Sequence, residues 1–141
     1  MEKNIFTMKF NDIKISDCLL KENNFPLVFK NCLLKEALDE MDKFKLGVVV
    51  IVNSNKELEG IITDGDIRRS LIKNQKPLSA ALVDDAIKYS IKNPKYIDHD
   101  NNLYDSIKFM NNNNIWDLPV VKNGCVVGLL HLHSALSKLI F

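Results

Sequence analysis

The stretch Gly60-Ile61-Ile62-Thr63-Asp64-Gly65-Asp66-Ile67-Arg68-Arg69 decides the fold of this 141-residue chain. Its apolar first half predicts a strand, and the hydroxyl of Thr63 is typical of the residue that precedes a helix. A helix start carries unpaired backbone N–H groups and the positive end of the helix dipole. The stretch therefore predicts a strand that turns into a helix at a point suited to an anion.

Two interpretations of its polar half are open. In the first, Asp66, together with Asp64 in the same turn, accepts hydrogen bonds from a ligand diol such as a ribose. The guanidinium groups of Arg68 and Arg69 then bind phosphate oxygens, and Thr63 adds a hydroxyl. In the second, Thr63 or Asp64 caps the helix, the acids complement its dipole, and the arginines are solvated.

The same architecture occurs twice, which favours the first interpretation. Apolar positions of the helical segment 34–41 fall on 103–110 at a constant spacing of 69 residues. Gly60–Thr63 falls on Gly128–His131 at a spacing of 68, with the one-residue difference placed in a turn. We therefore expect a unit that is used twice. The expected strands or extended segments are 13–20, 25–28, 47–52, 58–63, 95–97, 116–121 and 125–130, and the expected helical segments are 33–41, 64–73, 80–90, 103–110 and 132–139.

The repeat divides the chain into a tail or linker at 1–12, a first repeat at 13–77 and a second repeat at 78–141. The net charge is +1 with scattered basic residues, which predicts no nucleic-acid partner. Three cysteines without a CxxC spacing favour a reducing compartment. No leader and no apolar run of membrane-spanning length is found, so we expect a cytoplasmic protein without a membrane partner.

A repeated strand–helix–strand–strand–helix unit that closes on Gly-apolar-apolar-Thr/Ser-x-x-Asp resembles a tandem cystathionine-β-synthase (CBS) domain pair, or Bateman module. Gly60, Thr63 and Asp66 occupy the signature positions. The resemblance covers residues 13–140. It implies an α+β fold in which two CBS (β-α-β-β-α) repeats pack as a pseudo-twofold pair.

A narrower resemblance lies within this family. The string 62–69 is similar to the Thr-Asp-Gly-Asp-Leu-Arg-Arg string in the CBS regions of arabinose-5-phosphate isomerases, which supply the precursor of Kdo and of capsule polysaccharides. Gly128–His133 is similar to their His-x-His ending. The resemblance implies a regulatory module without catalytic residues, either excised from such an enzyme or free-standing. It further implies a sugar-isomerase domain as partner in the parent protein and a homodimer.

The resemblance also implies a nucleotide or sugar-nucleotide ligand, either an adenine nucleotide or a CMP-sugar, and no required cofactor or metal. It assigns Asp66 to a ribose diol, Thr63 to a phosphate, and Pro26 and Leu27 to the neighbourhood of the base. The second copy departs from the pattern, because His131 takes the Thr position and Ser134 the Asp position. With His133 nearby, this second cleft is expected to be weak for ribose or suited to an acidic ligand.

Three alternatives to a ligand-binding module are open. The pair could be a structural oligomerisation module without a ligand. Asp64 and Asp66 could instead hold a metal in a small transferase. His131 and His133, with His99 as a third ligand, could bind a metal ion. Otherwise these histidines are ordinary residues of a cleft or an interface. Trp116 is interpreted as a core or dimer-interface residue.

Overall fold

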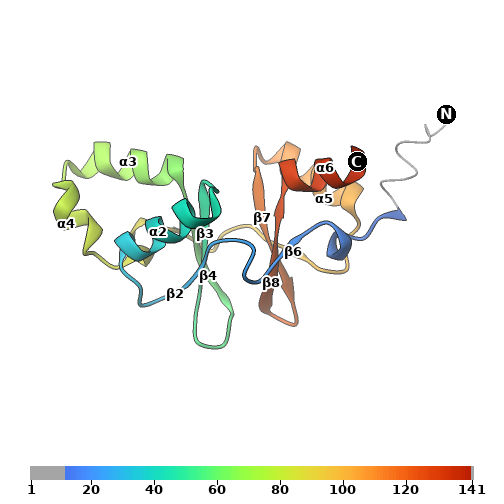
Figure 1. The fold of residues 1–141 in the computed structure, drawn as a ribbon, viewed down its shortest axis with the longest axis horizontal. Helices are drawn as coiled ribbons and strands as arrows, with labels where there is room; N and C mark the ends of the chain where they lie inside the picture. The colour runs from blue at the N-terminus through green and yellow to red at the C-terminus, as the bar shows by residue number, and fades with distance from the viewer. Residues whose placement is uncertain (1–11, 141) are drawn as a thin grey trace. The chain divides into compact units, whose positions relative to one another are not determined.

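The computed structural model describes residues 12–140, so the predicted tail at 1–12 lies outside the described residues except for Asp12. The chain forms two compact units. We call Glu22–Pro94 with Gly124–Val126 the N-repeat unit, and the described residues of the remainder the C-repeat unit. Both are α+β, as predicted, and their elements are labelled in Figure 1. Among residues 12–140, no helix is long and apolar enough to cross a membrane.

The N-repeat unit is built on a four-stranded sheet in the order β2-β3-β4-β5. Strand β3 is buried along its whole length, as expected for a continuous β-branched run. It pairs in parallel with β2 and antiparallel with β4. Its elements are β2 (Leu27–Phe29), α2 (Leu34–Phe44), β3 (Val48–Val52), β4 (Leu58–Thr63), α3 (Asp64–Asn74), α4 (Leu78–Leu82), the 3-10 helix η2 (Ala86–Tyr89) and β5 (Ile91–Lys92).

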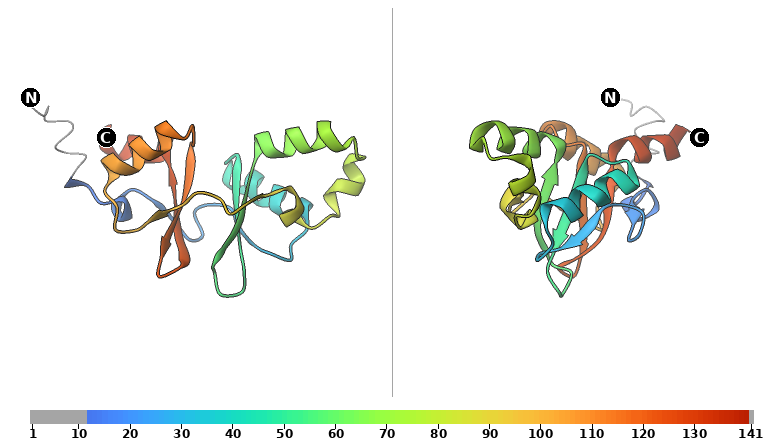
Figure 2. Two further views of the ribbon diagram at one scale, coloured as in Figure 1. Left: turned by 180° about the vertical axis from the view of Figure 1, so that it is seen from behind. Right: turned by 60° about the vertical axis from the view of Figure 1, so that its left-hand side comes forward.

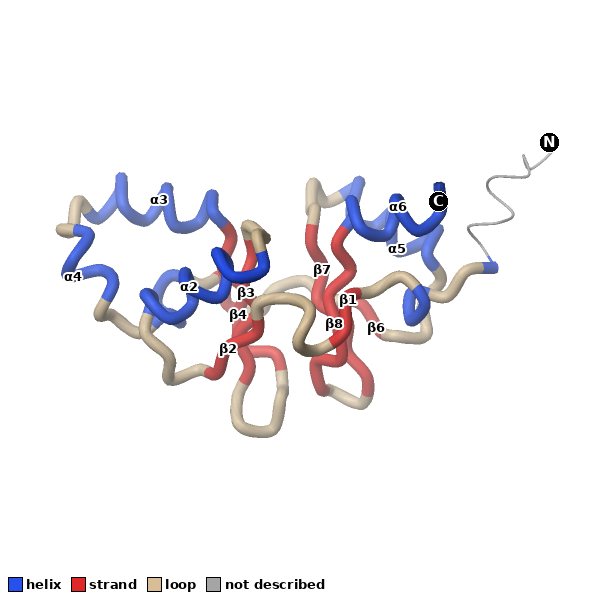
Figure 3. Tube along the Cα trace, viewed as in Figure 1, coloured by secondary structure: helices blue, strands red, loops and turns tan. Residues whose placement is uncertain are grey.

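Helix α2 covers this sheet through the apolar stripe that the sequence predicts. Leu34 and Ala37 are fully buried, Met41 is nearly so, and all three pack with Val49, Ile51 and Ile62 of the sheet. The exposed side of the helix carries charged residues, among them the Lys35–Asp39 ion pair. The helix ends where Lys45 adopts a left-handed backbone conformation. In Figure 3, α2 and α3 are both labelled to the left of strands β3 and β4.

The C-repeat unit has the sheet order β1-β8-β7-β6, so the segment nearest the described N-terminus joins the second repeat. Leu20 pairs antiparallel with Leu129, and Lys21 with Gly128. Ile15 and Leu19 pack into the same core as Leu103 and Leu130. Its elements are the 3-10 helix η1 (Ile15–Asp17), β1 (Leu20–Lys21), β6 (Ile97–Asp98), α5 (Leu103–Asn112), β7 (Asp117–Lys122), β8 (Cys125–His131) and α6 (Leu132–Ile140).

The compact units therefore divide the chain differently from the sequence repeats. Residues up to Lys21 belong to the C-repeat unit, although the first repeat is expected to begin at residue 13. Residues 78–94 belong to the N-repeat unit, although the second repeat is expected to begin there. The reason is pairing: β1 adds to β8, and β5 adds to β4. Figure 2 lets the reader follow both segments from two further sides.

Candidate functional site

The start of α3 is fixed by a reciprocal capping box. The Thr63 hydroxyl accepts the backbone N–H of Asp66 at 3.2 Å, and Oδ2 of Asp66 accepts the backbone N–H of Thr63 at 2.9 Å. The same Oδ2 also accepts the Thr63 hydroxyl at 2.9 Å. Two helix-start donors are thereby satisfied, as in any capping box. The sequence interpretation of Thr63 as the helix cap is thus confirmed.

The second oxygen of Asp66 is held by the next turn of the helix. Arg69 donates from Nη2 to Oδ1 of Asp66 at 2.9 Å, while the Arg69 side chain is 64% exposed and that of Asp66 only 11%. The guanidinium group lies over Gly65, where a Cβ would come within 3.0 Å of it. Arg68 points to the exposed side of the same helix. The structure therefore groups Thr63, Asp66 and Arg69 and leaves Arg68 outside the group.

Asp64 lies against the turn that precedes β3. Its backbone N–H donates to the carbonyl of Gly47 at 3.0 Å. A Cβ on Gly47 would lie 2.5 Å from the Asp64 carboxylate, so the missing side chain makes room for that acid. Sequence reasoning did not select Gly47. The signal was available, because glycine directly before a buried strand often marks a close approach of other groups.

Pro26 and Leu27 reach the same end of the sheet as Thr63. The Pro26 carbonyl accepts the Val50 N–H at 3.0 Å, Leu27 is aligned with Val50, and Thr63 is aligned with Val48. Since β2 and β4 flank β3, the two segments lie on either side of it, about 10 Å apart at ordinary strand spacing. Pro26 itself is buried, so the groups that this segment can offer to a ligand are those of its backbone.

The C-repeat unit has a different pair at the equivalent position. Nδ1 of His131 lies 2.6 Å from Oδ1 of Asp117, and the two side chains are 20% and 15% exposed. At the spacing of the repeats, His131 corresponds to Thr63 and Asp117 to Val48, which are aligned in the N-repeat unit. Burial raises the pKa of Asp117, and the hydrogen bond from His131 opposes that rise. An imidazole–carboxylate pair thus replaces a hydroxyl and an apolar side chain.

The neighbours of this pair also depart from the N-repeat unit. The N–H of Leu132 donates to the carbonyl of Trp116 at 3.0 Å, just as Asp64 donates to Gly47. Trp116 therefore stands where the other unit has glycine. It is 71% exposed. Of the two interpretations of Trp116, the core residue is therefore wrong, and the dimer-interface residue stays a prediction. His133 is exposed, with its ring centroid 6.3 Å from that of His131.

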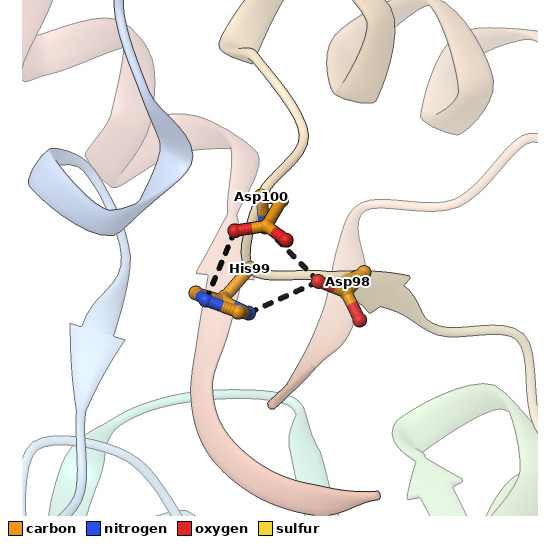
Figure 4. A group of neighbouring side chains, drawn as sticks. All are labelled: Asp98, His99 and Asp100. Carbon is orange, nitrogen blue, oxygen red and sulfur yellow. Dashed lines mark hydrogen bonds and ion pairs between the residues drawn. The ribbon is translucent and has the colours of Figure 1, made fainter. Parts of the chain in front are cut away.

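Within residues 12–140, Asp98, His99 and Asp100 are the one group of three or more side chains whose possible metal-ligating atoms lie close together. Figure 4 shows the His99 ring between the two carboxylates, with Nδ1 3.0 Å from Asp98 and Nε2 3.0 Å from Asp100. The two ring nitrogens therefore face different carboxylates. His131 and His133 do not belong to this group, so the three-histidine metal site is wrong.

Asp117 is the residue of this region that sequence reasoning missed. The repeat places it on an apolar strand position, Val48, and such a position gives no reason to expect a charge. Its signal was the acid directly before the apolar run Leu118–Val121. Asp64 and Asp66, proposed as a metal pair, belong to no three-residue ligand cluster in the part of the chain that the structure describes.

The CBS domain family matches residues 16–73 and 83–140. Among curated relatives, the uncharacterized protein RP505 of Rickettsia prowazekii is 31% identical over 93% of this chain and 39% of its own length. Arabinose 5-phosphate isomerase KdsD of Yersinia pestis is 28% identical over 88% of this chain and 37% of its own length. The chain thus spans well under half of each of these relatives.

A solved structure has a similar fold. It is the CBS domain pair of protein MJ0100 in complex with 5′-methylthioadenosine and S-adenosyl-L-methionine, with a TM-score of 0.74 and 25% identity. The match covers 90% of this chain and 94% of that one. The predicted resemblance to a tandem CBS pair is confirmed by these matches. The chain belongs to the CBS domain family and carries two copies of the domain.

Proposed function

We propose that this CBS pair is a regulatory module that binds an adenosine-containing ligand through the start of α3. The observation that carries the proposal is the Asp66 carboxylate, which is fixed in position and still has room for one more donor. A carboxylate offers about four acceptor positions, and Thr63 and Arg69 use three of them. The remaining position, on Oδ1, suits a ribose hydroxyl.

Arg69 gives this site a means of adapting to a phosphate. Its guanidinium group is exposed and is joined to Asp66 by a surface ion pair, which is weak by nature. A phosphate oxygen can compete for the guanidinium, and the release of Arg69 frees a second acceptor position on Oδ1. The Thr63 hydroxyl lies beside the same turn. Ribose and phosphate would then be bound by adjacent residues of α3, with the backbone of Pro26 and Leu27 near the base.

The ligand of the related CBS pair supports this choice of chemistry, because that protein was solved with two adenosyl compounds. The likeness to KdsD supports an arabinose-5-phosphate isomerase as the parent protein, with this chain as its regulatory part in the cytoplasm. The ligand would act by binding two arrangements of the module, or of a homodimer, with different affinities. A CMP-sugar is the alternative ligand in such a pathway.

A thermal-shift panel with AMP, S-adenosyl-L-methionine and a CMP-sugar tests the proposal. A ligand at 100 times its dissociation constant stabilises the folded state by about 2.7 kcal/mol. We expect a raised melting temperature with the adenosyl compounds. The absence of a shift with every compound at millimolar concentration would contradict the proposal and favour a ligand-free oligomerisation module.

Asp66→Asn locates the site and has a matched control in the other repeat. Asp105 is the third residue of α5, its N–H is accepted by the capping residue Asn102, and the Asn102 amide donates to its carboxylate at 3.1 Å. Asp105→Asn therefore makes the same change at the same helical position. We expect Asp66→Asn to abolish most of the ligand-induced shift and Asp105→Asn to retain it. Equal shifts in both variants would exclude Asp66 as a ligand-binding residue.

A further inference from the structure

Strand β2 is the edge strand of the sheet in the N-repeat unit, and Figure 3 labels it below α2. The carbonyl of Pro26 and the N–H of Lys30 both form hydrogen bonds to β3, at 3.0 and 2.8 Å. Alternate residues of a strand direct their backbone groups to the same side. The backbone groups of Leu27 and Phe29 therefore point away from β3.

Two of these outward groups are open to a further strand. Among residues 12–140, the Leu27 carbonyl and the Phe29 N–H have no hydrogen-bond partner, whereas the Phe29 carbonyl accepts the N–H of Cys32 at 3.0 Å. One residue of an added parallel strand can donate to Leu27 and accept from Phe29, in the pattern by which β2 itself bonds to β3. Main-chain bonds of this kind hold peptides on exposed sheet edges.

An open groove of about 600 Å³ lies between this edge and helix α2. Its strand side includes Phe29, which is 54% exposed. Its helix side is acidic and carries Glu36, Asp39 and Glu40. Asp39 is paired with Lys35, but Glu36 and Glu40 have no ion-pair partner in the part of the chain that the structure describes.

The two unpaired glutamates favour a cationic occupant. Like charges four residues apart repel each other across one turn of a helix and destabilise it. The same negative charge acts within the groove, because burial and, next, Glu36 raise the pKa of the Cys32 thiol to about 11. A cation between Glu36 and Glu40 would relieve the repulsion. The charge of the groove is therefore complementary to Lys or Arg side chains.

The fold does not require this combination of side chains. At the spacing of 69 residues, Phe29 corresponds to Asp98 and Glu40 to Phe109, while the position of Glu36 stays acidic. The C-repeat unit thus has an acid on the strand and an aromatic ring on the helix, although it shares the same elements. The acidic groove beside an apolar edge is a property of one repeat only.

The geometry selects an extended peptide with alternating side chains. Val28 packs in the core with α2, so the Leu27 and Phe29 side chains lie on the opposite face of the sheet. Alternate side chains of an added strand lie about 6.7 Å apart. Glu36 and Glu40 are about 6 Å apart along the axis of α2. Basic residues of the strand would thus face the helix and apolar ones the side of Phe29.

A second copy of this chain is excluded by its charge. Antiparallel pairing of β2 with its own copy would place both α2 helices on the same face of the joined sheet, where their unpaired glutamates would face each other. We propose that β2 and α2 bind an extended peptide segment of another protein, in which basic residues alternate with apolar ones, as a further strand of the N-repeat sheet.

Fluorescence anisotropy of a labelled Lys-Val-Lys-Val-Lys-Val peptide tests the proposal on the full chain. We expect Glu36→Gln with Glu40→Gln to weaken binding about fivefold, the effect of two surface ion pairs. The control Glu57→Gln with Glu59→Gln removes the same charge outside the groove and should bind like the wild type. Both control glutamates accept the Asn53 amide, and glutamine keeps the accepting oxygen.

Phe29→Pro tests the strand edge. Proline removes the outward N–H and no hydrogen bond between β2 and β3, whereas Phe29→Val retains that N–H. We expect the peptide to bind at least roughly fivefold more weakly to the proline variant than to the valine variant. Circular dichroism and the melting temperature show whether each variant is folded. If the proline variant does not fold, the comparison of the two glutamate pairs decides.

Three results would overturn the proposal. An absence of binding to the wild type at millimolar protein concentration excludes the groove as a peptide site. Equal weakening by both glutamate pairs would show attraction by net charge alone. Equal affinities of the proline and valine variants would show that the peptide does not add to β2. None of the substituted residues belongs to the site proposed for the adenosyl ligand, so the two proposals are tested independently.

Discussion

Replacement of Gly128 by alanine should destabilise the C-repeat unit, because β1 approaches β8 too closely for a side chain. A Cβ at this position would lie 2.5 Å from a methyl group of Leu19 and 2.8 Å from the backbone oxygen of Leu20. The methyl group can rotate away, but the oxygen belongs to a paired strand. Overpacking of this kind costs about 1–3 kcal/mol of unfolding free energy. For a chain of this size the melting temperature should fall by about 3–12 °C.

Gly65→Ala is the matched control for this change. A Cβ there would meet only the guanidinium group of Arg69, at 3.0 Å, and that exposed group can move. Because Gly65 lies within α3, alanine should be neutral or should stabilise the helix by up to about 1 kcal/mol. Both variants are compared by calorimetric melting. A Gly128→Ala variant as stable as the wild type would refute the pairing of β1 with β8.

Three further changes test single contacts. Thr63→Ala removes the acceptor of the Asp66 N–H and should cost about 1 kcal/mol in chemical denaturation; an unchanged midpoint would contradict the capping box. A hydrogen bond from Lys76 lowers the pKa of Asp84. The ionised Asp84 therefore stabilises the folded state above pH 3.8, and this stability is lost as the pH falls through the lowered pKa. In Lys76→Met the melting temperature should fall less steeply as the pH is lowered. The same pH dependence as in the wild type would exclude the contact between Lys76 and Asp84. Burial raises the pKa of Asp117, so stability present below 3.8 is lost as pH rises through the raised pKa. Asp117→Asn should remove this loss of stability with rising pH. If the variant loses the same stability as the wild type, Asp117 is not the cause.

The interior of the N-repeat unit could be predicted from local sequence. The strand expected at 58–63 is β4. Strand β3 begins one residue later than the run expected at 47–52. Continuous β-branched residues and a capping residue are local signals, and a buried strand followed by a capped helix leaves little choice of conformation. The apolar stripe of α2 likewise follows from helical spacing.

The pairing of the short strands β1 and β5 with the other repeat could not be predicted in this way. Strands β1 and β5 have two residues each, too few for a periodic pattern. Their positions depend on partners elsewhere in the chain, and β1 pairs with β8 near the other end of the sequence. Local reading therefore assigned residues 13–21 to the repeat that follows them in sequence. The closely approached Gly128 is the one residue that hints at β1.

The candidate site was predictable in part. Thr63 and Asp66 were selected as ligand residues, and the structure also gives them a local role in capping α3. His131 was selected because it replaces the signature threonine, but its partner Asp117 was not. A side chain that pairs across a sheet is not visible in the spacing of either strand. The exposure of Trp116 was missed for a related reason, since an aromatic residue beside a strand is usually buried.

Whether Asp66 accepts a ribose hydroxyl can be measured in a single calorimetric comparison. AMP and 2′-deoxy-AMP are each titrated into the wild type and into Asp66→Asn. A hydrogen bond to a charged group contributes about 1.5–3 kcal/mol, so the wild type should bind AMP roughly 10-fold or more tightly than the deoxy compound. In Asp66→Asn the two affinities should become nearly equal. The same preference for AMP in both proteins would show that Asp66 does not accept this hydroxyl.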